Sequence, residues 1–139
     1  MGKAAAFAIV LSTLSLCSCG SGQDTSLPGA LPMAGVYMRI TAEEASQMME
    51  LSSGYILLDV RTQSEYDEKR IPGAVLIPDY ELAKRVEAEL PDKEAQILIY
   101  CRSGRRSASA AKELISMGYT SVYDFGGIID WPYETESGR

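Results

Sequence analysis

The chain has 139 residues, enough for one domain with a substantial core and additional terminal segments. Its formal net charge of −6 argues against nonspecific nucleic-acid binding, so we expect no nucleic-acid partner. The sequence contains no histidine, which excludes Cys-His and Ser-His-Asp catalysis and the common histidine-containing zinc sites; we expect no metal and no cofactor. The three cysteines, Cys17, Cys19 and Cys101, suit neither a four-cysteine metal site nor a disulfide framework.

Residues 1–18 have the pattern of an export signal. The apolar run Ala4–Leu16 is too short to span a membrane as a helix, but it suits a secretory signal. The segment Leu16-Cys17-Ser18-Cys19 is similar to a bacterial lipobox, although Cys17 is an unusual residue within one. We therefore expect lipidation of Cys19 and an exported protein held by its lipid anchor alone to a bacterial membrane, facing the periplasm or the cell exterior. A signal that is simply cleaved to release a free protein is the alternative.

Export by either route leaves Cys101 as the one free thiol, because Cys17 is removed and Cys19 is lipidated or removed. A thioredoxin-like dithiol mechanism is thereby excluded, since it needs a second thiol. Residues 20–35 are rich in Gly, Ser, Pro and Ala and are expected to form a flexible tether. The folded domain is expected at residues 36–135.

Within the domain, helical patterns alternate with short apolar runs. Thr41-Ala42-Glu43-Glu44 predicts a capped helix that continues to about Leu51, and Thr62 to Glu65 predicts a short helical turn in the same way. The run Tyr55–Val60 is typical of a buried parallel strand. Further strands are expected at 74–77, 96–100 and 121–124, a turn at Gly126-Gly127, and helices at 81–90 and 107–117, the last with Ala108, Ala111, Leu114 and Ile115 facing inward. This alternation predicts an α/β domain with a mainly parallel sheet.

The most informative segment is the Cys101 loop, residues 101–106, which follows the strand expected at 96–100. Ligands of parallel sheets bind at the carboxyl ends of strands, where Cys101 lies. Loop N–H groups and the dipole of the following helix both favour thiolate over thiol. The guanidinium groups of Arg102, Arg105 and Arg106 act in the same direction and attract anions. The segment therefore predicts a nucleophilic cysteine in an anion-binding cradle.

The roles of the individual loop residues are less constrained. The N–H groups of residues 102–106, Ser103 among them, are expected to stabilise charge on the sulfur, and Gly104 lets the loop curl without a Cβ clash. Arg106 is expected to contact the substrate or to shape the loop. Arg102 and Arg105 are expected to contact the substrate or to point into solvent.

Three residues are expected to support the loop. Ser107 is expected to cap the following helix. Asp59, at the end of a strand, is expected either to accept hydrogen bonds from loop N–H groups or to hold an arginine. Arg61 is expected to form a partly buried ion pair with Glu65 that fixes the loop.

Several motifs, in this order, resemble those of the rhodanese (thiosulfate sulfurtransferase) homology domain over residues 38–132. They are Leu57-Leu58-Asp59-Val60-Arg61 with Glu65-Tyr66, Arg70-Ile71-Pro72-Gly73-Ala74 with Ile77-Pro78, Cys101-Arg102-Ser103-Gly104-Arg105-Arg106-Ser107, and Gly126-Gly127 with Trp131. The resemblance implies a three-layer α/β domain with a mainly parallel central sheet flanked by helices. Arg70 departs from the pattern, because many relatives have histidine there, and this implies an altered pocket rim.

The resemblance also implies a two-step sulfur transfer. The Cys101 thiolate would take a sulfur from a small anionic donor such as thiosulfate, and a thiol or cyanide would then accept it from the Cys101 persulfide. One alternative is a relay module that carries the persulfide without turning over thiosulfate. A phosphatase or arsenate reductase is disfavoured, because the five residues after Cys101 end at Arg106, one short of that pattern. A catalytically dead interaction domain is disfavoured by the retained cysteine.

Overall fold

The computed structural model describes residues 34–138. The expected signal at residues 1–18, the lipidation of Cys19 and nearly all of the expected tether at 20–35 lie outside the described residues. Within residues 34–138, no helix has the length and apolar character needed to cross a membrane.

A five-stranded sheet, parallel throughout, forms the centre of the domain. Its strands, in the spatial order β1-β5-β4-β2-β3, are β1 (Val36–Arg39), β5 (Ser121–Gly127), β4 (Gln96–Cys101), β2 (Tyr55–Asp59) and β3 (Val75–Leu76). The expected α/β class with a central sheet flanked by helices is confirmed. The carboxyl ends of β2, β4 and β5 lie side by side, so the residues that follow these three strands meet at one edge of the sheet.

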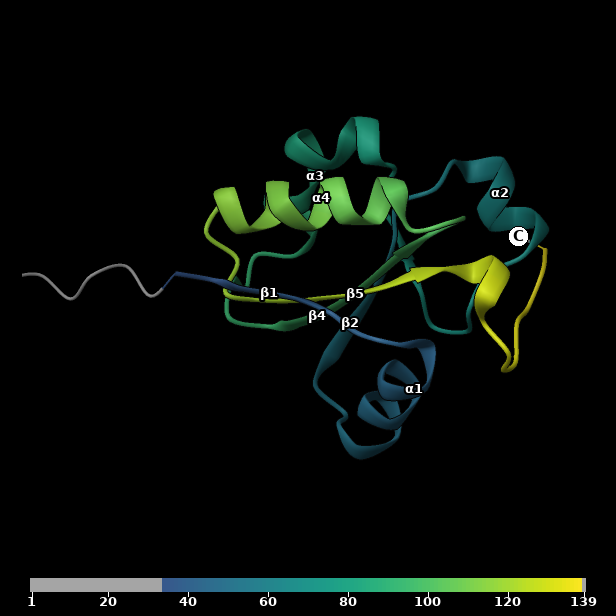
Figure 1. The fold of residues 1–139 in the computed structure, drawn as a ribbon. Coiled ribbons are helices and arrows are strands. Elements are labelled where there is room, and N and C mark those ends of the chain that lie inside the picture. The colour runs from purple at the N-terminus through teal and green to yellow at the C-terminus, as the bar shows by residue number, and fades with distance from the viewer. Residues whose placement is uncertain (1–33, 139) are drawn as a thin grey trace, which may run out of the picture. The chain divides into compact units, whose positions relative to one another are not determined.

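Helices cover both faces of this sheet (Figure 1). They are α1 (Ala42–Leu51), α2 (Gln63–Glu68), α3 (Leu82–Glu89) and α4 (Arg105–Ser116), with short 3-10 turns η1 (Asp79–Glu81) and η2 (Ile128–Asp130). α3 and α4 lie on one face and α1 lies on the other (Figure 1). This arrangement gives the domain three layers.

Each face of the sheet has its own hydrophobic core, because side chains alternate along a strand. On the face with α3 and α4, Ile97, Ile99 and Cys101 of β4 pack in one buried cluster. On the face with α1, Leu98 and Tyr100 belong to the other. The alternation therefore places the Cys101 side chain on the α4 side of the sheet and the neighbouring Tyr100 ring on the α1 side.

Two helix starts follow the expected capping chemistry. At α1 the Thr41 hydroxyl accepts from the Glu44 N–H, and the Glu44 carboxylate accepts from the Thr41 N–H. At α2 Thr62 and Glu65 make the same reciprocal pair. Both capping boxes predicted from the sequence are confirmed, and the second one fixes Glu65 beside the Cys101 loop.

Several boundaries differ from expectation. The last helix begins at Arg105, before Ser107, and Ala110 is fully buried in it while Ala108 is only half-buried. The expected turn at Gly126-Gly127 lies inside β5, which runs on to Gly127 with a register irregularity opposite Cys101. The edge strand β1 was not expected, because most of its residues are exposed and give no buried apolar pattern.

Candidate active site

The Cys101 loop is a tight turn between β4 and α4, and Gly104 makes it possible. Gly104 has φ +93, in the region that favours glycine, and the Gly104 N–H donates to Cys101 Sγ over 3.0 Å. A Cβ at this position would also lie 3.1 Å from Arg39 Nη2 and 3.2 Å from Gly126 Cα. The backbone conformation and the close packing both require glycine at position 104. This confirms the prediction that Gly104 lets the loop curl without a Cβ clash.

Gly127, on β5, packs tightly against the Cys101 loop and leaves no room for a side chain. A Cβ on Gly127 would collide with the Arg102 carbonyl oxygen and would lie 2.7 Å from Ser103 Cα. The backbone of β5 therefore lies directly against the Cys101 loop. Arg39 of β1, which sequence analysis did not single out, packs its guanidinium beside the same two backbones.

The Cys101 sulfur is buried and surrounded by hydrogen-bond donors. The residue is 1% exposed. Burial by itself raises the pKa of the thiol, but the N–H and hydroxyl of Ser107 and the N–H groups of Gly104 and Ser103 act against it. Together these hydrogen bonds lower the pKa of Cys101 below its ordinary value. The loop therefore favours the nucleophilic thiolate, as a persulfide-forming or acyl-transferring cysteine requires.

Arg106 is held by Glu65. Its Nη2 lies 2.7 Å from Glu65 Oε1 and its Nη1 lies 3.0 Å from Oε2, a two-pronged contact between α4 and α2. Hydrogen bonding to Arg106, assisted by Thr62, lowers the pKa of Glu65 to about 2 even though burial opposes this. Of the two roles expected for Arg106, the structure shows the loop-shaping one.

The expected ion pair between Arg61 and Glu65 is wrong. Arg61 Nη2 pairs instead with Asp59 Oδ2 at 2.6 Å and also donates to the Lys69 carbonyl oxygen over 2.6 Å. Both side chains are buried, and the guanidinium stacks over the Tyr100 ring at 5.5 Å. Arg61 follows Asp59 by two positions, and the Arg61 N–H and Nε also donate to the Asp59 carboxylate. This closeness in the chain explains why Arg61 pairs with Asp59 and not with Glu65.

Asp59 therefore holds an arginine, the second of its two expected roles. Asp59, Arg61 and Tyr100 lie on the α1 side of the sheet, whereas the Cys101 side chain lies on the α4 side. The network supports the strand ends beneath the loop and does not supply a group to the sulfur.

Ser107 does not cap α4, contrary to expectation. The N-cap residue is Gly104, which has no side chain, and Ser107 lies within the first turn. The fully buried Ser107 hydroxyl is 2.7 Å from Asp124 Oδ1 and 3.2 Å from the Gly104 carbonyl oxygen. Asp124, on β5, was missed by sequence analysis; the available signal was a carboxylate that precedes Gly126-Gly127 in a buried strand.

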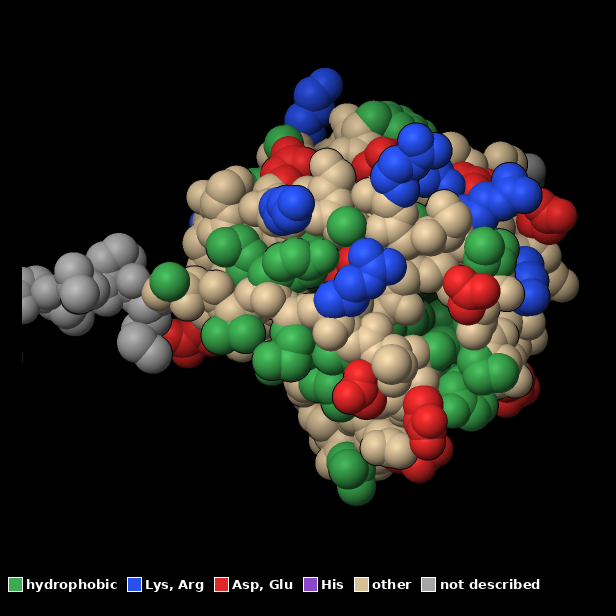
Figure 2. Space-filling model, viewed as in Figure 1, with side chains coloured by type: hydrophobic (Ala, Val, Ile, Leu, Met, Phe, Trp, Pro, Cys, Tyr) green, Lys and Arg blue, Asp and Glu red, His purple; other side chains and the backbone are tan. Residues whose placement is uncertain are grey.

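The mouth of the site is basic. A pocket of about 430 Å³ beside the loop is lined by Asp79, Arg102, Ser103, Arg105, Arg106 and Ser109. Arg102 and Arg105 are exposed there, whereas Arg106 is tied to Glu65. Lys and Arg side chains gather over the end of the molecule where α4 begins and α2 lies (Figure 2). Among the three arginines that line the pocket, Arg102 and Arg105 are therefore the ones available to bind an anionic ligand.

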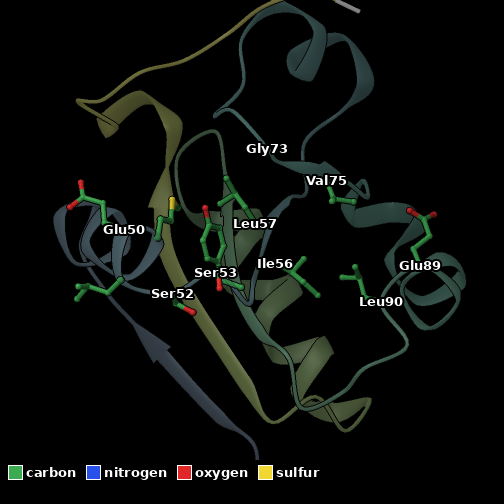
Figure 3. A pocket seen from close by; sticks show the side chains of 12 residues that line it. Glu50, Ser52, Ser53, Ile56, Leu57, Gly73, Val75, Glu89 and Leu90 are labelled. Atoms are coloured by element: carbon green, nitrogen blue, oxygen red, sulfur yellow. The ribbon is translucent and has the colours of Figure 1, made fainter.

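A second pocket has different chemistry. About 770 Å³ in volume, it lies near the start of β2, and its lining includes Glu50, Ser52, Ser53, Ile56 and Glu89 (Figure 3). Its lining contains acidic, hydroxyl and apolar side chains but no basic one. An anionic ligand is therefore favoured at the Cys101 mouth and not here.

Arg70 does not form part of the Cys101 pocket rim. Its Nε pairs with Glu136 Oε1 at 2.8 Å, and its guanidinium stacks over the Tyr66 ring at 4.7 Å. Reciprocal backbone hydrogen bonds of 2.8 Å join Arg70 to Glu136, and the Arg70 side chain also donates to the Gly138 carbonyl oxygen. Arg70 thus holds the C-terminal segment against α2. Within residues 34–138, no group of three or more acidic or cysteine side chains could hold a metal ion.

Comparison with known proteins agrees with this geometry. The family model described as "Rhodanese-like domain" matches residues 41–132, and the chain belongs to that family. Over 73 residues it is 38% identical to Thiosulfate sulfurtransferase PspE of Escherichia coli (strain K12), covering 52% of this chain and 70% of the relative. A protein named Sulfurtransferase from Allochromatium vinosum is 38% identical over 93 residues, which is 66% of this chain and 85% of the relative.

The fold is shared with solved structures. A structure described as "rhodanese with anions from E. coli" matches with a TM-score of 0.55 at 36% identity, over 60% of this chain and 99% of that chain. The three-layer rhodanese fold is therefore confirmed, and the family relationship is to sulfurtransferases.

Proposed function

We propose that this protein moves a sulfane sulfur from thiosulfate, or a similar small anion, to a thiophilic acceptor through a persulfide on Cys101. The single observation that carries the proposal is the Cys101 sulfur itself, buried at the carboxyl end of β4 with the Gly104 N–H 3.0 Å away. Hydrogen bonds from Ser107, Gly104 and Ser103 lower its pKa below the ordinary value. Such a thiolate needs no general base, and the chain has no histidine to act as one.

The first step balances without a further reactant. The Cys101 thiolate attacks the outer sulfur of thiosulfate, a new S–S bond forms, and the bond to the sulfonate sulfur breaks. The electron pair leaves with sulfite. The N–H groups that face Sγ then stabilise the negative charge of the persulfide, as an oxyanion hole does for oxygen.

The second step restores the enzyme. A thiolate or cyanide attacks the outer sulfur of the persulfide, and the electron pair of the breaking S–S bond returns to Cys101 as thiolate. Arg102 and Arg105, exposed at the mouth, attract the anionic donor, while Arg106 stays paired with Glu65 and keeps the loop in shape.

Intact mass spectrometry of the purified protein tests the cycle. Thiosulfate should add the mass of one sulfur atom, and cyanide should remove it; the Cys101→Ser variant should show neither change. If iodoacetamide modifies Cys101 while thiosulfate leaves the mass unchanged, thiosulfate is not the donor. Sulfur gained only from a protein persulfide would then support the relay function instead.

We also propose that residues 1–18 direct export and that Cys19 carries the lipid. Support comes from the apolar run and from the lipobox-like segment that ends at Cys19. Metabolic labelling with a radioactive fatty acid should label the full chain, and Cys19→Ala should abolish the label. Unchanged labelling of Cys19→Ala, or an unlabelled, released protein, would contradict lipidation at this residue.

A further inference from the structure

A buried carboxylate lies behind the Cys101 loop. Asp124, on β5, is fully buried, and none of the ion pairs formed within residues 34–138 includes it. Its Oδ1 accepts from the Gly126 N–H over 3.0 Å and from the Ser107 hydroxyl over 2.7 Å, and its Oδ2 lies 3.4 Å from the Tyr37 hydroxyl. Burying a carboxylate without a cation is costly, so its contacts are informative.

The Ser107 hydroxyl connects this carboxylate to the site. A serine hydroxyl has one proton to donate. Around Ser107 Oγ, the acceptors Asp124 Oδ1 at 2.7 Å, the Gly104 carbonyl oxygen at 3.2 Å and the Gly126 carbonyl oxygen at 3.4 Å compete for that proton. The Ser107 and Cys101 side chains both contact the backbone of Gly104, and the Ser107 hydroxyl lowers the pKa of Cys101. Asp124 and the Cys101 thiolate are therefore rival acceptors of one hydrogen.

We propose that Asp124 is a positioning residue which, by accepting the Ser107 hydroxyl, limits how strongly that hydroxyl donates to the Cys101 thiolate. The inference rests on the proposed role of Cys101 as the nucleophile. The short distance from Oγ to a charged acceptor favours Asp124 in the competition, because hydrogen bonds to carboxylates are about twice as strong as neutral ones. Asp124 thus keeps the thiolate less stabilised and more nucleophilic than the loop alone would make it.

Replacing Asp124 by Asn weakens the rival acceptor and keeps its shape. The Ser107 proton then turns toward Cys101, which lowers the pKa of the thiol and the nucleophilicity of its thiolate together. For a decrease of about one pKa unit, the rate constant of the fully ionised thiolate falls about threefold, given a Brønsted slope of about 0.4–0.5. Ser107→Ala removes the donor and is expected to raise the pKa of Cys101.

A double-mutant cycle tests whether Asp124 acts on Cys101 through Ser107. The pH dependence of alkylation by iodoacetamide gives the pKa of Cys101 and the limiting rate constant in the wild-type protein, Asp124→Asn, Ser107→Ala and the double variant. We expect Asp124→Asn to lower both values in the wild-type background and to change neither in the Ser107→Ala background. An equal effect in both backgrounds would mean that the charge of Asp124 acts directly, and no effect in either would mean that Asp124 has no influence; both results overturn the proposal.

The control variants address the other groups near Asp124. Tyr37→Phe removes the weaker contact to Asp124 without touching Ser107 and should leave the pKa of Cys101 unchanged. Arg39, whose guanidinium lies beside Gly104 and Gly126, stays intact in every variant. If Asp124→Asn does not fold, Asp124→Ser gives the same comparison with a neutral acceptor. Alkylation needs no sulfur donor, so failure of this proposal is distinct from failure of thiosulfate transfer.

Discussion

Glu65 and Arg106 bring α2 and α4 together across 41 positions of sequence, with Arg106 Nη2 2.7 Å from Glu65 Oε1. The capping box of α2 fixes the carboxylate, and the carboxylate fixes the first turn of α4. The start of α4 in turn presents the N–H groups that face Cys101. A side chain outside the Cys101 loop thus holds the shape of the loop.

Glu65→Gln should weaken this arrangement by about 1 kcal/mol, because it turns a charge-assisted contact into a neutral one. The effect depends on pH. Since the pKa of Glu65 is about 2 in the folded protein and 4.5 in the reference state, its stabilisation is complete above about 4.5 and is lost as the pH falls toward 2. Denaturant unfolding should therefore show the wild-type advantage over Glu65→Gln shrinking across this range. The exposed Glu68→Gln on the same helix is the control, and a pH-independent difference would contradict the assignment.

Cys101 should react as a thiolate below the ordinary pKa of a thiol. The pKa of Cys101 is lowered from 9.0, so the alkylation rate by iodoacetamide should reach half its maximum at a pH below 9.0. Ser107→Ala should move this midpoint upward, because the Ser107 hydroxyl is one of the groups that lower the pKa of Cys101. A midpoint at or above 9.0 in the wild-type protein would show that burial outweighs the loop donors.

Arg102→Ala and Arg105→Ala should each raise KM for thiosulfate a few-fold and leave kcat nearly unchanged. Both side chains are exposed at the pocket mouth, where they attract the donor without touching the buried sulfur. The increase should shrink at high ionic strength. Lys112→Ala, an exposed cation on the outer part of α4, is the matched control. An equal rise in KM for Lys112→Ala would assign the effect to overall charge.

Arg61→Met should destabilise the fold by about 3–5 kcal/mol, because it leaves the Asp59 carboxylate buried without its partner. Asp59→Leu combined with Arg61→Met removes both charges and should recover part of that loss. Chemical denaturation of Arg61→Met, Asp59→Leu and the double variant measures these effects. If the double variant is as unstable as the sum of its single changes, the two residues do not act as a pair.

Local patterns in the sequence predicted the elements that build the site. The capping boxes of α1 and α2, the buried strands β2 and β4 and the turn at Cys101 all follow from residues close together in the chain. Residues far apart in sequence escaped prediction. Glu65 was assigned to Arg61, four positions away, because nothing local shows that α2 lies against the first turn of α4.

The edge strand β1 escaped prediction for a related reason. It is recognisable only from its pairing with β5, a strand far away in the sequence. Without β1, Arg39 could not be placed beside the loop, and Tyr37 could not be placed beside Asp124. The chemistry of a strand end depends on which strands become its neighbours, and that is set by long-range packing.

The first N–H groups of α4 are satisfied differently from those of α1 and α2. In α1 and α2, the N–H groups at the N-cap and three residues later are satisfied by a capping box. In α4 the equivalent groups belong to Gly104 and Ser107: the Gly104 N–H donates to the Cys101 sulfur over 3.0 Å, and the Ser107 N–H lowers the pKa of Cys101. The nucleophile is therefore also the cap of the helix, and its ionisation is linked to folding. Because the folded pKa is lowered, unfolding should become harder as the pH rises from that pKa toward 9.0, so a stability curve can report the state of the sulfur without any substrate.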